Sequence, residues 1–464
     1  MINQICTLTA QELIEAFQKK KLSPVEVMEA VLIQAETLNP HINALFGSAP
    51  DRALALAYES EQRWGKNQPK GILDGLPLTV KDSIKATGFP SWHGCKANMQ
   101  SPLDTEDSPP AARLKESGAI IFAKTAMSDI GMLASGVSSA HGITRNPWNT
   151  DFNPGGSSSG AAAAVAAGIG PCSIGTDGGG SVRLPAAHCG LFGFKPTNGR
   201  IPHLPTDPVR SAGPLTRSVA DGALLMNVLT RPDSRDFGSL PPVQTTYHKK
   251  LERGLQGVRL GLLLNMGFGP SASDEVIQAV QKAAGVFEEA GAVVEPVSLT
   301  FGFNPLTAIE RYFMVRTFLE FNTLAEPQKE QVLPYIQQWV AGASAVSGVE
   351  LMTTMSIIEQ TKAILTAQFE KQDYILSPVM PDVGFPAESL GADNANPIDH
   401  IGFAGLYNQT GQPAASIGCG FAENGLPIGL QIIGKRFDDL GVLQLSYAYE
   451  QRREFDISWP MISA

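Results

Sequence analysis

Charged residues, aromatic residues and cysteines are all scarce in this sequence. Of its 464 residues, 17% are charged, 7% are aromatic and five are cysteine. The cysteines are scattered and form no C-x-x-C pair, which gives no zinc signature and is typical of reduced thiols in a cytoplasm. We therefore expect a cytoplasmic protein with no metal site.

Long hydrophobic runs and an excess of positive charge are also missing. No apolar stretch of about 20 residues occurs, so we expect no membrane-spanning helix. The start, MINQICTLTAQEL, lacks the basic and apolar regions of a signal peptide. The net charge of −10 argues against nucleic acid or an anionic membrane as a main partner.

Strand-like and helix-like patterns alternate along the chain, which is 43% apolar and rich in glycine and proline. The strand candidates are 76–82, 119–125, 171–177, 258–264, 374–379 and 430–433. The helix candidates are 105–117, 182–188, 219–229, 274–290, 351–371 and 440–452. This alternation predicts one large α/β domain. Its least regular part is 300–400, which we expect to shape a substrate pocket.

Two capping boxes mark helix starts near the N-terminus: TAQE from Thr9 and SPVE from Ser23. We expect two helices within 7–38, ended by the Asn-Pro pair at Pro40, and a third helix at 49–64.

Two glycine-rich turns that contain serine stand out in the middle of the sequence. The first, GGSSSG at 155–160, runs into an alanine-rich helix, and the second, GGGS at 178–181, follows the strand candidate 171–177. Glycine permits positive φ and lets backbone N–H groups point into a cavity. A serine beside such free amides is half of an acyl-transfer site.

The first turn matches two common motifs only in part. No lysine follows Gly160, so the turn is not a P-loop. Ser158 fits the centre of G-x-S-x-G, but a nucleophile elbow must follow a buried strand. The preceding segment, 146–154, holds two prolines and three asparagines and cannot be that strand.

Ser181 fits a nucleophile better, because it lies where a strand candidate turns into the short helix 182–188. A helix N-terminus offers unpaired N–H groups and a positive dipole end. The alternative is a helix-capping serine, which is common. A serine nucleophile needs a base, yet none of the seven histidines stands in a triad-like motif. His188, seven residues after Ser181, does not face it on a short helix.

Lys81 offers another base, since it ends an apolar strand candidate. Burial disfavours the charged form and lowers the pKa of a lysine. A drop of about three units corresponds to roughly 4 kcal/mol, which a packed core can sustain. The alternative is a surface lysine that closes a strand, because lysine is rarely buried.

Together these residues resemble the amidase signature family. The similarity spans about 7–450 and is carried by the motifs around Lys81, Ser157 and Ser181, DGLPLTVKD from Asp74, NPWN from Asn146, the block 153–197, NQTGQPA from Asn408 and GLPIGLQ from Gly425.

The resemblance implies a single domain over 1–464 with a central mixed, twisted β-sheet covered by helices on both faces. Its expected parts are N-terminal helices at 7–64, a signature core at about 70–230, a variable pocket-shaping region at about 300–400 and a C-terminal return to the core at 401–455.

The resemblance also implies the chemistry: a serine acyl-enzyme, with no cofactor and no metal. Ser181 would attack an amide carbonyl, Ser157, after a cis peptide bond, would bridge, and Lys81 would be the ultimate base. The oxyanion hole would be Gly178, Gly179 and Gly180. Residues expected to support the site or bind substrate are Met127, Ser128, Ser158, Thr176, Asp177 and Arg183.

Departures from the family pattern bear on the substrate: Ala126, Ser159 and Gly178 are small residues at positions where other residues are frequent. The family's glutaminase subunits are expected to hold glutamine's carboxylate with an arginine from late in the chain. Because 337–368 has no arginine, we expect a neutral or apolar acyl group, with Arg311 or Arg316 as the alternative anchor.

Three functions therefore stay open: a stand-alone amidase, the glutaminase subunit of a tRNA-dependent amidotransferase, and a urea-derivative hydrolase. A non-catalytic binding protein on the same fold is disfavoured, because all three catalytic positions are intact. The expected partner is a small-molecule amide, with no nucleic acid and no membrane, and a homodimer is among the expected assemblies.

Overall fold

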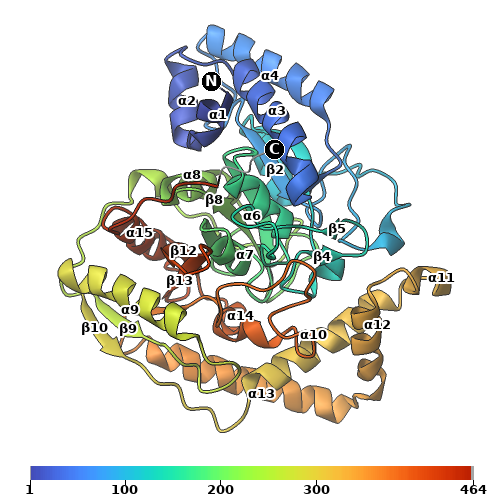
Figure 1. The fold of residues 1–464 in the computed structure, drawn as a ribbon, viewed down its shortest axis with the longest axis vertical. Helices are drawn as coiled ribbons and strands as arrows, with labels where there is room; N and C mark the ends of the chain where they lie inside the picture. Colours follow the sequence, from blue (N-terminus) through green and yellow to red (C-terminus); the bar gives the residue numbers. More distant parts are fainter. Residues whose placement is uncertain (1, 461–464) are drawn as a thin grey trace.

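A mixed sheet of eleven strands runs through the centre of the computed structural model, which describes residues 2–460 (Figure 1). Its order is β1-β3-β2-β6-β8-β7-β12-β13-β11-β9-β10. The strands are β1 Leu45–Phe46, β2 Pro77–Lys81, β3 Ile120–Thr125, β6 Cys172–Asp177, β7 Phe192–Lys195, β8 Ser211–Thr216, β9 Arg259–Leu262, β10 Val293–Pro296, β11 Tyr374–Pro378, β12 Ala414–Phe421 and β13 Pro427–Gly434. A separate hairpin pairs β4 Val137–Ser138 with β5 Gly142–Ile143.

Two parallel groups lie within this sheet. Strand β2 is parallel to both of its neighbours, β3 and β6, and β9 is parallel to β10 and β11. The remaining neighbours are antiparallel. Strands β2 and β6 are buried along their whole length, as expected of strands with both faces covered. Their carboxyl ends meet at one edge of the sheet.

Helices cover both faces of the sheet (Figure 1). Helices α6 and α7 pack on one face with α3 and α4, while α5, α8, α9 and α15 pack on the other. The helices are α1 Ile2–Thr7, α2 Ala10–Gln18, α3 Pro24–Ile42, α4 Pro50–Gly65, α5 Pro109–Glu116, α6 Ser159–Ala166, α7 Arg183–His188, α8 Val219–Leu229, α9 Asp274–Glu289, α10 Pro305–Phe321, α11 Glu326–Lys329, α12 Pro334–Ala341, α13 Gly348–Gln368, α14 Gly402–Gln409 and α15 Asp439–Glu450.

The expected α/β architecture with a covered mixed sheet is confirmed, and so are both N-terminal capping boxes. Thr9 and Ser23 each accept from the backbone N–H three residues on, and the glutamate there returns the bond. The predicted end of the second helix, at Pro40, was wrong, because α3 continues through Pro40 to Ile42. Its end is fixed instead by Asn43, whose φ of 49° is left-handed.

Two further expectations need correction. The candidate 105–117 becomes helical only at Pro109, because a residue that precedes proline avoids the helical conformation. The segment 300–400 is more regular than expected, since α10 to α13 occupy most of its first two thirds. Helices α10 and α13 pack against each other at the end of the molecule opposite α1 and α2 (Figure 1).

Within the described residues, no single helix is both long and apolar enough to cross a bilayer. One helix pair, Pro334–Ala345 with Gly348–Gln368, reaches the required length and composition together but is bent by 108°.

Candidate active site

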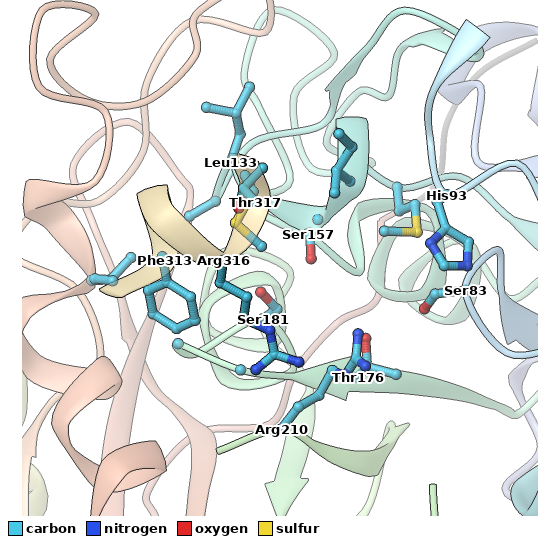
Figure 2. Close-up of a pocket in the computed structure, with 18 of the residues that line it drawn as sticks. Ser83, His93, Leu133, Ser157, Thr176, Ser181, Arg210, Phe313, Arg316 and Thr317 are labelled. Atoms are coloured by element: carbon cyan, nitrogen blue, oxygen red, sulfur yellow. The ribbon is translucent and has the colours of Figure 1, made fainter. Parts of the chain in front are cut away.

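A cavity of about 230 Å³ opens where β2 and β6 end, and Lys81, Ser157 and Ser181 all line it. The three residues come from three different segments: the end of β2, the turn before α6 and the turn before α7. Figure 2 shows the side chains of Ser157 and Ser181 facing the same space. The sheet therefore brings together the residues that the sequence singled out.

Lys81 is a buried lysine with defined partners. Its Nζ lies 2.8 Å from Ser157 Oγ and 2.9 Å from Thr176 Oγ1, and its side chain is 1% exposed. Burial, reinforced by the nearby Arg210 cation, lowers the pKa of Lys81 to about 7. A substantial fraction of Lys81 is therefore neutral near neutral pH and can accept a proton.

Ser157 is held by close backbone packing. The Gly156–Ser157 peptide bond is cis, as the resemblance implied. A Cβ on Gly156 would lie 2.4 Å from the carbonyl oxygen of Ser135, so only glycine fits before Ser157. Gly131 is a neighbour of the Ser157 side chain, because a Cβ on Gly131 would lie in ordinary van der Waals contact with Ser157 Oγ, at 3.4 Å.

Ser158 ties the two glycine-serine turns together. Its backbone N–H donates to the carbonyl oxygen of Ser181 at 3.2 Å. Its hydroxyl donates to the carbonyl oxygen of Thr176 and accepts from the Thr176 N–H, at 3.2 and 3.3 Å. Ser158 is fully buried and does not line the cavity. Its bonds fix the position of Ser181 relative to Ser157.

Asp177 organises the turn that carries Ser181. Its carboxylate accepts from the N–H groups of Gly180 and Val182 at 2.7 and 3.2 Å. Arg183 binds it in a bidentate pair at 2.9 and 3.0 Å, with both side chains fully buried. Burial alone would raise the pKa of Asp177, but the Arg183 cation lowers it well below its ordinary value. The turn is thus built around a permanent carboxylate.

Gly180 is consequently not a free donor, which corrects one expectation about the oxyanion hole. Its N–H points at Asp177 and cannot also point into the cavity. Within residues 2–460, the N–H groups of Gly178, Gly179 and Ser181 have no acceptor. Those three residues line the cavity, whereas Gly180 does not. Three residues whose amides have no acceptor in this part of the chain therefore line the cavity, and amides of this kind suit the binding of an anion.

Arg183 is itself held by residues that the sequence did not single out as site residues. Its guanidinium also donates to the Asn408 side chain at 2.6 Å, the Gln431 side chain at 2.6 Å and the carbonyl oxygen of Ala404 at 2.9 Å. Asn408 in turn donates to Asp177. Asn408 and Gln431 lie in the motifs NQTGQPA and GLPIGLQ, which stand out in the sequence. No local sequence pattern, however, shows that both side chains bind Arg183.

Met127 and Ser128 take different positions. Met127 lines the cavity, with its Cε near Gly131. Ser128 does not line it and donates instead to the carbonyl oxygen of Leu133 at 2.8 Å, which stabilises the cavity-wall turn. Thr176 lines the cavity beside Lys81.

Of the seven histidines, which all lie in the described part of the chain, only His93 lines the cavity, and its Nδ1 lies 3.6 Å from Glu320. His188 is buried against Phe385 and outside the cavity. Burial lowers the pKa of His188 to about 3. Lys81, rather than a histidine, is therefore the basic group in contact with a serine of this site.

One wall of the cavity is formed by charged side chains that the sequence did not identify as a group. Asp207, Arg210 and Arg316 line it together. Arg311, the other candidate anchor, does not line it, and its Nη1 bonds the Thr354 hydroxyl at 3.4 Å.

Comparisons with known proteins match amidases and related proteins over most of the chain. The family model "Amidase" matches residues 26–443. The A-type subunit of the glutamyl-tRNA(Gln) amidotransferase of Heliobacterium modesticaldum is 32% identical, over 97% of each chain. The acylamidase of Rhodococcus erythropolis is 31% identical over 96% of this chain and 95% of its own.

Solved structures are similar as well. A bacterial aryl acylamidase of the amidase signature family superposes with a TM-score of 0.91 at 31% identity, over 97% of this chain and 96% of its own. The peptide amidase of Stenotrophomonas maltophilia gives 0.84 at 26% identity, over 99% of both chains.

Proposed function

The chain belongs to the amidase signature family and is a hydrolase of amide C–N bonds, and we propose that Ser181 is its nucleophile, Ser157 its proton relay and Lys81 its base. The observation that carries this proposal is the 2.8 Å contact between Lys81 Nζ and Ser157 Oγ, in a cavity that Ser181 shares. A buried lysine with a lowered pKa beside a hydroxyl is a pair suited to proton transfer.

In the proposed reaction, neutral Lys81 accepts the Ser157 proton while Ser157 accepts the proton of Ser181. Ser181 Oγ attacks the amide carbonyl carbon and forms a tetrahedral intermediate. The proton returns through Ser157 to the departing nitrogen, the C–N bond breaks, and an ester to Ser181 remains. Water, deprotonated along the same path, then releases the acid and restores Ser181.

The oxyanion is held in this scheme by the amides of Gly178, Gly179 and Ser181. Preorganised amides in a site that excludes water stabilise a developing negative charge, and one such donor contributes about 3–4 kcal/mol in other enzymes. Asp177 supports them indirectly, because its bond to Gly180 sets the path of the turn.

The acyl group of the substrate is proposed to be neutral or apolar where it contacts the apolar lining of the cavity. The apolar side chains of this lining include Met127, Leu133, Leu184, Phe313, Trp339 and Ile401. Apolar walls with a few placed polar groups are typical of small-molecule sites. Aryl and short aliphatic amides fit this description.

Turnover of a panel of amides tests the proposal. We expect the purified protein to release acid and amine from aryl or short aliphatic amides, and Ser181→Ala to release neither. Glutamine and urea-type amides complete the panel and separate the remaining alternatives. Absence of turnover for every amide, in a protein whose Ser181 reacts with a fluorophosphonate, would contradict the proposed substrate class.

A glutaminase subunit is the second candidate, and the identity to A-type amidotransferase subunits over nearly the whole chain favours it. Ammonia release from glutamine that appears only when partner subunits are present would support it. The expectation that nucleic acid is not a partner stays a prediction, since those relatives are named for a tRNA. A homodimer, a cytoplasmic location and the part boundaries of the domain also stay predictions.

A further inference from the structure

The lining of the active-site cavity changes from apolar to polar along helix α10. Four residues of this helix line the cavity: Phe313, Arg316, Thr317 and Glu320. They are spaced by three, four and seven positions and therefore share one face of the helix. Within two helical turns, the lining thus passes from an aromatic ring to a carboxylate. The cavity has an apolar end and a polar end.

The polar end also holds His93 and Ser83, which both line the cavity. Figure 2 shows these two side chains on one side of Ser157 and Phe313 on the other. Within residues 2–460, the Ser83 hydroxyl has no hydrogen-bond partner. The His93 ring makes no hydrogen bond in this part of the chain either, and its Nδ1 lies 3.6 Å from Glu320. The ring is therefore available to a ligand.

His93 is held in place by Asp82, the residue that follows the proposed base. The Asp82 carboxylate accepts from the N–H groups of Trp92 and Gly94, on either side of His93, at 2.6 Å each. It is fully buried and lies 2.9 Å from the Nε2 of His141. Burial would raise the pKa of Asp82, but the bond to His141 holds it below its ordinary value. A permanent carboxylate thus clamps the loop that carries His93.

The backbone of His93 is in the left-handed region, with a φ of 53°. A residue with a Cβ adopts this conformation at a cost in free energy, so it persists only where the surroundings impose it. Here the two bonds to Asp82 impose it. Residues held in this way are concentrated at sites that bind or react. The loop therefore presents the imidazole to the cavity in a fixed position.

His93 lies on the side of the cavity from which the amine departs in the proposed reaction. Its carbonyl oxygen accepts from the N–H of Ile130 at 2.7 Å, and the next residue, Gly131, is a neighbour of Ser157 Oγ. Because Ser157 passes the proton to the departing nitrogen in that reaction, the amine lies beside Ser157. The amine side of the substrate therefore meets the polar end.

The acyl side meets the apolar end. A Cβ on Gly179 would lie 3.4 Å from Ile401 and 3.9 Å from Phe313. The amide proposed to hold the oxyanion thus borders two apolar side chains. The two halves of a substrate consequently contact linings of different chemistry.

The fixed charges of the cavity balance one another. Besides Lys81, the described residues that line it include two cations, Arg210 and Arg316, and two anions, Asp207 and Glu320. Arg316 forms an ion pair with Asp207, and the Nε of Arg210 lies 3.6 Å from the same carboxylate. Two positive and two negative charges leave no excess of either sign. A neutral hydrogen-bonding group is therefore better suited to the polar end than an ion.

We propose that His93 determines specificity for the departing amine, by forming a hydrogen bond with a neutral polar group, such as a hydroxyl, carried on that side of the scissile bond. A hydroxyl both donates and accepts, so it suits either tautomer of the ring. This inference rests on the proposed function and deepens it, because it adds a polar amine side to a substrate whose acyl side is apolar.

Matched anilides of butanoic acid test the contact. The meta-hydroxy anilide is compared with the meta-methyl anilide, and the meta-hydroxymethyl anilide with the meta-ethyl anilide, so that size is kept while the hydrogen-bonding group is lost. We expect the hydroxyl compound of at least one pair to exceed its partner in kcat/KM by about threefold or more, the scale of one neutral hydrogen bond. A ratio below threefold in both pairs would overturn the proposal.

The acyl side provides the matched control. The anilides of meta-hydroxyphenylacetic acid and meta-methylphenylacetic acid carry the same two substituents on the other side of the scissile bond. Because that side meets Phe313 and Ile401, we expect no preference for the hydroxyl. An equal preference for the hydroxyl on both sides would overturn the assignment to the amine.

Variants of His93 assign the effect to this residue. His93→Gly removes the ring and fits the left-handed backbone without strain, so the hydroxyl-to-methyl ratio should fall to near one. His93→Asn also tolerates this backbone and keeps a hydrogen-bonding group, so it should retain part of the ratio. Asn67→Gly is the matched control, since Asn67 has a φ of 54° at an exposed position outside the cavity. A ratio that stays at threefold or more in His93→Gly would overturn the assignment.

Binding to Ser181→Ala separates this inference from the proposed function. Calorimetry should show that Ser181→Ala binds the preferred hydroxyl anilide about threefold more tightly than its partner, and that adding His93→Gly removes the difference. This result without hydrolysis of any amide by the wild type would reject the proposed function and keep the contact. Hydrolysis of all four butanoic anilides at equal rates, without a difference in binding, would keep the function and reject the contact.

Discussion

The carboxylate of Asp177 accepts a hydrogen bond of 2.7 Å from the backbone N–H of Gly180. This bond removes one amide from the glycine turn and leaves its neighbours free to face the cavity. The same carboxylate is neutralised by Arg183, so the shape of the turn that carries Ser181 depends on one fully buried ion pair.

Asp177→Asn should therefore destabilise the protein and its site together. The neutral amide leaves Arg183 as an uncompensated buried charge, and breaking such a pair costs about 3–5 kcal/mol. Urea unfolding measures the loss, and kcat should fall in the fraction that stays folded. Asp373→Asn is the matched control, since the Asp373–Arg259 pair is partly exposed to solvent, with side chains 32% and 48% exposed, and its loss should change the midpoint little. Equal effects of both changes would contradict the organising role of Asp177.

The pH dependence of hydrolysis should report Lys81. Its pKa is lowered to about 7 by burial, and in the proposed reaction the neutral form is the base. The value of kcat/KM should therefore rise tenfold per pH unit below about pH 7 and level off above it. Lys81→Met should lower the rate by about 10³-fold, within the range found for general bases. A profile that stays flat through pH 7 would point away from Lys81.

Ser181→Ala should remove hydrolysis, by a factor on the order of 10⁴ or more, because the proposed reaction passes through an ester to this hydroxyl. The folded state should persist, since the Ser181 side chain lies at a cavity wall. Circular dichroism and fluorophosphonate labelling check both points. Ser446→Ala is the control: this buried serine donates to the carbonyl oxygen of Val442 in its own helix. Residual labelling of Ser181→Ala would identify a different nucleophile.

Two helix glycines should respond in opposite directions to alanine. Gly160 lies in α6, where a Cβ would fall 2.2 Å from the carbonyl oxygen of Ala44 and 2.5 Å from the N of Ala126. Such a clash with backbone costs about 1–3 kcal/mol or more, which exceeds the gain of about 1 kcal/mol in helix propensity.

Gly285 is the matched glycine, because it lies in α9 with nothing within 4 Å of its Cβ position. Gly285→Ala should raise the free energy of unfolding by about 0.5–1 kcal/mol, and Gly160→Ala should lower it. Chemical denaturation of both variants decides the sign. Stabilisation by Gly160→Ala would mean that α6 can move away from β3 at little cost.

Local patterns determined much of the fold. Thr9 and Ser23 cap their helices through residues three positions away, and such bonds are encoded in a few neighbouring residues. The strand around Lys81 and the turn at Ser181 were likewise recognisable, since apolar runs and glycines act locally. The strands β7, β8 and β12 were not predicted, because they are stabilised by pairing with one another and their own sequences show no clear strand pattern.

By itself, the sequence determined the family, the candidate serines and the candidate base, because these depend on residue type and order. Only the tertiary structure decided which groups meet. In the fold, Lys81 is buried against Ser157 and the Gly180 amide donates to Asp177. Arg210 and Arg316 both lie beside the carboxylate of Asp207. The first contact joins residues 76 apart in the chain, and Arg316 meets a residue more than 100 positions earlier. Such partners are chosen by sheet order and helix packing, which no local pattern contains.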